Sequence, residues 1–150
     1  MERPVSLDSA TRLHLEKVLG HTFHNPELLV TALTLPSRAR ELGVPCLKAL
    51  ANLGDKTLAQ VLAAQRVRTA LDIPKGLLTE QLKELVSNRS LAEVARSVGL
   101  PQHLFRGNCE RSAALSVGQL GDALEALIGA VFLDSDYETA ERVVLRLVGG

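Results

Sequence analysis

The sequence predicts an all-α fold, and three observations support this. Apolar residues make up 46% of the 150-residue chain, aromatic residues make up only 3%, and tryptophan is absent. The core must therefore be built from leucine, alanine and valine, and leucine and alanine rank high in helix propensity. Apolar residues also recur at helical spacing, and capping residues precede several of these runs.

Two helices are expected in the first part of the chain. The first is capped by Asp8 or Ser9 and stops at Gly20. The second opens at Asn25–Pro26, where a capping residue precedes a proline at the first helical position. We expect Pro36 to end this second helix, with a short loop to follow.

A long helix is expected from about Leu47 to Leu71, because its leucine and valine residues fit a helical period. Gly54 lies inside this helix, where glycine costs about 1 kcal/mol relative to alanine. The usual reason for such a glycine is the close approach of another helix or of a ligand.

The second half of the chain predicts four more helices, separated by a turn at 101–105 and an exposed polar loop at 106–112. The expected caps are Thr79 for the first of them and Asn88 for the second, which ends at Gly99. The expected ranges are 79–86, 88–99, about 114–133, and a last helix that carries 140–147.

Length and composition narrow the class of protein. A chain of 150 residues fits one domain, residues 1–150. Seventeen basic and seventeen acidic residues give no net charge, unlike domains that bind phosphates through bulk positive charge. We see no membrane-spanning run and no secretory or transit segment at the N-terminus, so a soluble cytoplasmic protein is the default expectation.

The histidines and cysteines show no metal-ligand spacing. Cys46 and Cys109 lie far apart without a CxxC motif, and both are expected to be buried or half-buried. His21, His24 and His103 are expected on the surface.

Three carboxylates are candidates for chemistry. Asp122 and Glu125 are three residues apart on a predicted helix, so they share one face within an apolar run. Burying such a pair is unfavourable unless something compensates, and Mg²⁺ coordination is one compensation. A solvated stripe on an amphipathic helix is the other interpretation, and spacing leaves both open. Asp55, taken alone, is more typical of an exposed aspartate than of a ligand.

Two stretches resemble the acidic signatures of the ribonuclease III family. The family's second signature, Asp-Ala-Leu-Glu-Ala-Leu-Ile-Gly-Ala, is matched letter for letter from Asp122 to Ala130. Its first signature, Glu-Arg-Leu-Glu-Phe-Leu-Gly-Asp, is matched only in part up to Asp55. Weaker similarity extends over about residues 12–148, including 20–29, 34–37 and 85–92.

The resemblance implies an all-α endonuclease domain that pairs as a two-fold homodimer and binds double-stranded RNA in the valley between the subunits. It also implies Mg²⁺, or Mn²⁺, bound by acidic residues that activate water for attack on a phosphodiester. Carried onto this chain, the metal ligands are Asp55, Asp122 and Glu125, and the catalytic residues are Asp55 and Glu125.

Three residues depart from the family pattern within the first signature. Ala51 stands where the family has a ligand glutamate, and Lys48 stands where it has another acidic residue. Asn52 replaces an aromatic residue of the family's dimer interface. Fewer carboxylates and an added cation should weaken metal binding. Glu41, the nearest acidic residue upstream, is not expected to replace the ligand glutamate that is missing at position 51. We also expect no double-stranded-RNA-binding domain of the kind that follows in many members.

Three functional hypotheses follow. The first is a catalytically impaired ribonuclease III-like domain, a pseudoenzyme that binds structured RNA or a protein partner as a dimeric scaffold. The second is an active Mg²⁺-dependent endonuclease of RNA processing that uses Asp55, Asp122 and Glu125. The third is a helical protein-interaction module without a role in RNA. The Ala51 and Lys48 substitutions favour the first.

Overall fold

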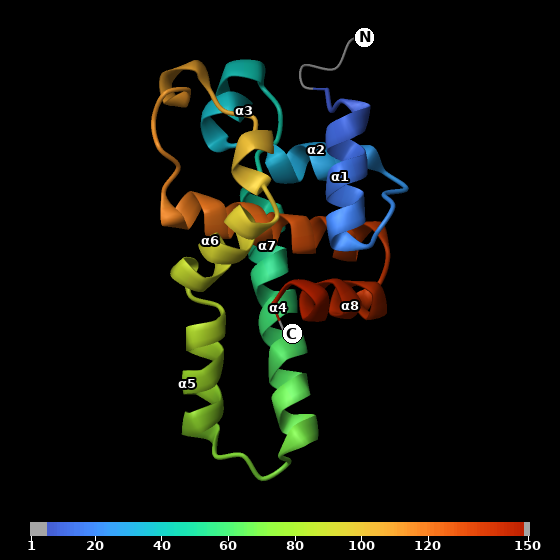
Figure 1. Cartoon of the computed structure of the whole chain (residues 1–150), viewed down its shortest axis with the longest axis vertical. Coiled ribbons are helices and arrows are strands. Elements are labelled where there is room, and N and C mark those ends of the chain that lie inside the picture. Colours follow the sequence, from blue (N-terminus) through green and yellow to red (C-terminus); the bar gives the residue numbers. More distant parts are fainter. Residues whose placement is uncertain (1–5, 149–150) are drawn as a thin grey trace.

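The computed structural model describes residues 6–148, which contain eight α-helices and two 3-10 helices but no β-strand (Figure 1). The helices are α1 (Ser9–Leu19), α2 (Pro26–Leu33), α3 (Pro36–Leu42), α4 (Lys48–Thr69), α5 (Lys75–Leu85), α6 (Asn88–Ser97), η1 (Leu100–His103), η2 (Asn108–Glu110), α7 (Val117–Asp134) and α8 (Tyr137–Leu147). The all-α prediction is confirmed. No helix in this range is long and apolar enough to span a membrane.

Helix α7 is the central element of the fold. It packs against α2, α4, α6 and α8, and it crosses α4 near the middle of the molecule (Figure 1). Every residue from Leu120 to Val131 except Asp122 is buried. A helix that is apolar nearly all round must be covered on all sides, which explains its central position. Asp122 is therefore the one residue of this stretch that reaches the surface.

Two glycines let α4 and α7 cross with their backbones in contact. A Cβ atom at Gly54 would overlap the main-chain carbonyl oxygen of Glu125, and one at Gly129 would overlap that of Leu50. Only glycine has no Cβ, so both positions exclude every other residue unless the helices move apart. The close helix approach predicted from Gly54 is confirmed.

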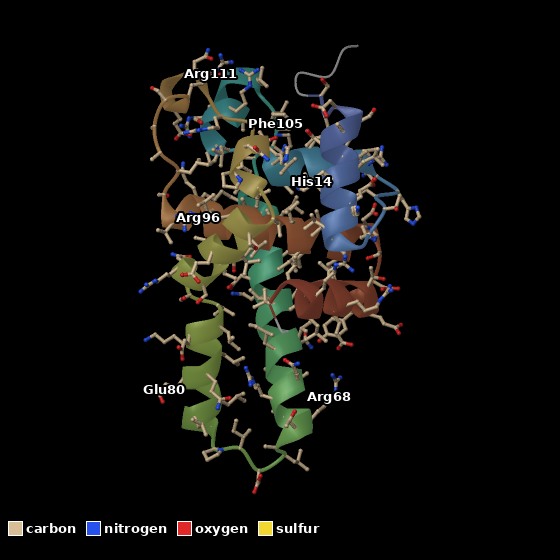
Figure 2. All side chains as sticks on the ribbon, in the orientation of Figure 1. His14, Arg68, Glu80, Arg96, Phe105 and Arg111 are labelled. Carbon is tan, nitrogen blue, oxygen red and sulfur yellow. The ribbon has the colours of Figure 1, made fainter. Side chains whose placement is uncertain are left out.

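The C-terminal half of α4 and the whole of α5 form an arm that extends away from the other helices (Figure 1). None of the eleven residues of α5 is buried, and Leu71 at the tip of the arm is 87% exposed. Figure 2 shows Glu80 on the outer side of α5 and Arg68 on the outer side of α4. Arg68 forms an ion pair with Glu141 of α8 at 3.5 Å, which ties the arm to the C-terminal helix.

Several helix boundaries were predicted correctly. The side chains of Asp8 and Asn25 accept hydrogen bonds from the first turns of α1 and α2. Gly20 and Gly99 have φ values of 72° and 74°, the left-handed conformation that ends a helix.

Three predicted boundaries were wrong. A short loop was expected after Pro36, but Pro36 is the first residue of α3. Proline suits the first position of a helix, because the nitrogen there needs no hydrogen-bond partner within the helix. Thr79 lies inside α5, where its hydroxyl donates to the carbonyl of Lys75 instead of capping the helix. Ser87, not Asn88, caps α6 by accepting from the amide of Ser90.

The burial predicted for two residues was also wrong. Cys109 is exposed in η2, whereas Cys46 is half-buried as expected. The side chain of His21 is only 8% exposed, because its Nε2 lies 2.7 Å from Oδ2 of Asp134. Asp134 also accepts hydrogen bonds from the amides of His24 and Asn25, so it fixes the loop between α1 and α2 to the end of α7.

Candidate functional site

The site lies where α4 and α7 cross. Asp55 follows the contact glycine Gly54 on α4, and Asp122 and Glu125 lie one turn apart on α7. Asp55 and Asp122 both act electrostatically on Glu125, and Asp55 is hydrogen-bonded to it. The fold therefore brings together three carboxyl groups from two helices that are far apart in sequence, and we call Asp55, Asp122 and Glu125 the acidic cluster.

Glu125 is the buried member of the acidic cluster, with 8% of its surface exposed. Burial is the largest cause that raises its pKa, followed by the hydrogen bond to Asp55 and by repulsion from Asp55 and Asp122. Together these effects raise the pKa of Glu125 to about 8, so it holds a proton at neutral pH. A protonated carboxyl is a hydrogen-bond donor and a poor metal ligand.

Lys48 forms an ion pair with Asp122, another member of the acidic cluster. Its Nζ lies 2.6 Å from Oδ2 of Asp122, and it donates a hydrogen bond to that oxygen. This hydrogen bond is the main cause that raises the pKa of Lys48, so the ammonium group stays charged. The prediction that Lys48 places a positive charge beside these carboxylates is confirmed.

A second lysine lies next to Asp55. The Nζ of Lys56 is 3.4 Å from Oδ2 of Asp55, and both side chains are exposed. The sequence patterns did not single out Lys56, although its position directly after Asp55 could have suggested it. Each of the two aspartates of the acidic cluster thus has a lysine as its partner.

Ala51 lies on the same face of α4 as Lys48 and Asp55, at spacings of three and four residues. It is 5% exposed, and its methyl group belongs to the hydrophobic core. Position 51 therefore provides no side-chain oxygen that could bind a metal ion. Glu41 does not supply one, since its carboxylate accepts hydrogen bonds from the amide of Asn108 and from Arg38.

These contacts bear on the predicted metal site. Residues 6–148 contain no group of three or more His, Cys, Asp or Glu side chains arranged to hold a metal ion. With Asp122 paired to a lysine and an alanine at position 51, the side chains as they stand do not fit a divalent cation. The metal and catalytic roles of Asp55, Asp122 and Glu125 stay predictions.

Comparisons with known proteins agree on the family. The family model described as ribonuclease-III-like matches residues 25–149. Ribonuclease 3 of Zymomonas mobilis is 41% identical over 132 residues, which is 87% of this chain and 52% of that protein. Ribonuclease 3 of Symbiobacterium thermophilum is 38% identical over 149 residues, covering 95% of this chain and 62% of that protein.

Solved structures show the same fold. The nuclease domain of ribonuclease III from Campylobacter jejuni superposes with a TM-score of 0.83 at 30% identity, covering 89% of this chain and 93% of that one. A second structure of that nuclease domain gives a TM-score of 0.82. The chain spans little more than half the length of the curated relatives and nearly all of a nuclease domain. By sequence and by fold, the chain belongs to the ribonuclease-III-like family.

Proposed function

We propose that this chain is a ribonuclease III-like domain that binds structured or double-stranded RNA as a homodimer and has lost efficient cleavage. The observation that carries the proposal is the ion pair between Lys48 and Asp122, next to a face of α4 where Ala51 supplies no ligand oxygen. A nuclease that uses Mg²⁺ needs ionised oxygen ligands that are free to reach the ion. Here the geometry of the acidic cluster opposes that arrangement.

RNA binding and dimerisation are supported by relatives. The curated relatives are ribonucleases 3, and the Campylobacter jejuni nuclease domain is described as having a flexible region involved in dimer formation. The exposed side chain of Asn52 on α4 leaves dimer formation to be tested, because the family resemblance places an aromatic residue there.

An active endonuclease is the second candidate function. The names of the relatives favour it, and so does the intact second signature with Asp122 and Glu125. In this case Mg²⁺ or Mn²⁺ would be held by Asp55, Asp122 and Glu125, and binding would have to displace Lys48 and deprotonate Glu125. An interaction module without a role in RNA is the third candidate, which zero net charge supports.

The test is to measure RNA binding and cleavage on the same preparation. A fluorescent double-stranded RNA of about 30 base pairs, enough to span a dsRNA-binding surface, is titrated with protein in EDTA. Single-stranded RNA and double-stranded DNA of the same sequence are measured beside it. We expect saturable binding that prefers double-stranded RNA, and a dimer in sedimentation analysis. A long double-stranded RNA is then incubated with Mg²⁺ or Mn²⁺ and wild type or Ala51→Glu.

The outcomes separate the three candidates. Binding without cleavage by the wild type, with partial gain of cleavage in Ala51→Glu, supports the proposal. Multiple-turnover cleavage by the wild type that Asp122→Asn abolishes supports the active endonuclease. No binding to any nucleic acid at low salt leaves the interaction module, and a monomer in sedimentation contradicts the dimer.

A further inference from the structure

We infer that the ammonium group of Lys48 takes the place of a divalent cation at the acidic cluster, so that the cluster is assembled and neutralised without metal. The inference deepens the proposed function, because it rests on the same site and explains how cleavage was lost. The experiment that tests this inference needs no RNA. A failure of the inference can therefore be distinguished from a failure of the proposed RNA binding.

The position of Lys48 lets it reach the acidic cluster. Lys48 and Asp55 are seven residues apart on α4 and therefore point to the same side of the helix, towards α7. The backbone contact of Gly54 with Glu125 keeps the two helices close at this point. The lysine stem can therefore cross from α4 to α7 and place its charge on a carboxylate that also interacts with Glu125.

The ion pair itself is short and partly shielded from solvent. Asp122 is the less exposed partner, with 29% of its side chain exposed against 62% for Lys48. The donor–acceptor distance of 2.6 Å is slightly below the usual range for a hydrogen bond between an ammonium group and a carboxylate. An isolated surface pair contributes little, but this pair supplies a cation to a group of three neighbouring carboxyls.

Both aspartates of the acidic cluster are paired with a lysine without a metal ion. Asp55 and Asp122 each have a lysine partner within 3.5 Å, namely Lys56 and Lys48. Two ammonium groups supply the two positive charges that one divalent ion would bring. An RNA phosphate approaching this face would therefore meet fixed cations, and it would not need a metal ion to screen the carboxylates.

The experiment compares thermal unfolding in EDTA with unfolding in millimolar MnCl₂ or MgCl₂ at equal ionic strength. We expect the melting temperature of the wild type to change by less than about 1 °C with either metal. Lys48→Ala should melt about 2–4 °C lower in EDTA, because the carboxyl groups lose their counter-charge. In Mn²⁺ the same variant should recover this loss in a saturable way, and Lys48→Ala/Asp122→Asn should not recover it.

Lys83→Ala is the matched control, since Lys83 is an exposed lysine on α5, outside the acidic cluster. It should melt like the wild type with and without metal. Lys48→Ala/Ala51→Glu should bind Mn²⁺ roughly tenfold or more tightly than Lys48→Ala in calorimetry, because it adds an oxygen ligand. Ala51 is buried, so a glutamate there could prevent folding, and Lys48→Ala alone then decides the question.

Two results would overturn the inference. One is a saturable rise in the melting temperature of the wild type with Mn²⁺ that Asp122→Asn removes, which would show that metal binds despite Lys48. The other is a Lys48→Ala variant that unfolds like the wild type in EDTA and gains no response to Mn²⁺.

Discussion

Gly54 of α4 lies directly against the main-chain carbonyl of Glu125 in α7. This contact sets the distance between the two helices that carry the acidic cluster. It also places the carboxyl of Asp55, the next residue after Gly54, within hydrogen-bonding reach of the Glu125 side chain. One glycine thus connects the packing of the core with the geometry of the site.

Gly54→Ala should destabilise the protein by about 2 kcal/mol or more. The new Cβ would overlap a backbone atom that cannot rotate away, and this outweighs the gain of up to about 1 kcal/mol in helix propensity. Chemical denaturation followed by circular dichroism measures the change. Gly76→Ala is the control, because its Cβ would meet no atom within 4 Å, and it should be neutral or stabilising.

The contribution of Glu125 to the stability of the protein should fall as the pH rises from about 4.5 to about 8. The folded protein keeps a proton on Glu125 up to a pKa of about 8, whereas the unfolded chain releases it near 4.5. The folded state therefore binds more protons in this window, and deprotonation is unfavourable to folding. Between pH 5 and pH 7 the loss from this group is at most about 3 kcal/mol.

Glu125→Gln should flatten this pH profile, because glutamine keeps the shape and a hydrogen-bond donor without titrating. Urea denaturation at pH 5, 6, 7 and 8 measures the profile. Glu80→Gln, on the exposed side of α5, should leave the slope unchanged. An equal slope in the wild type and Glu125→Gln would show that Glu125 is ionised in the folded protein.

Asp134→Ala should cost about 2–4 kcal/mol of stability. It removes the shared acceptor of His21 and of the amides of His24 and Asn25, and leaves these donors unpaired. Burial raises the pKa of Asp134, but the two amide donors and His21 more than offset this, so the pKa is lowered overall.

The stabilisation from Asp134 is therefore complete above pH 3.8 and is lost as the pH falls through the lowered pKa. Thermal unfolding at pH 7 and at pH 3 measures both effects. Asp72→Ala, at an exposed aspartate in the turn before α5, is the control and should have almost no effect. A loss for Asp134→Ala no larger than for this control would show that Asp134 does not anchor the loop.

Helix α5 should exchange its amide hydrogens much faster than α7. None of its eleven residues is buried, so it can open without disturbing the core, whereas most of α7 is buried. Native-state hydrogen exchange should show amides of 79–85 exchanging roughly tenfold or more faster than those of 124–131. Equal protection in both helices would indicate that a second copy or another partner covers the arm.

Sequence patterns predicted those parts of the fold that depend on neighbouring residues. Asn25–Pro26 marked the start of α2 because capping is local chemistry. Pro36 was misread because a proline that ends one helix is also suited to begin the next, and only the tertiary contacts of α3 decide between them. Gly54 was interpreted correctly, since a glycine inside a long helix usually marks a close contact with another helix or a ligand.

The site was predictable only in part. The resemblance located Lys48 beside the acidic residues, and the ion pair with Asp122 confirms this. The buried, protonated state of Glu125 was not predictable, because it depends on contacts from α4 that spacing within α7 does not reveal. The pairing of His21 with Asp134, 113 residues apart, left no local pattern in the sequence.

The proposed loss of cleavage is tested most directly with uniformly labelled, long double-stranded RNA and wild-type protein in excess over RNA, in the presence of Mn²⁺. Asp122→Asn serves as the blank for contaminating nuclease. We predict that wild type and Asp122→Asn release the same background of product over the same long incubation. Rapid release of discrete products by the wild type alone would show a working metal site and contradict the loss of cleavage.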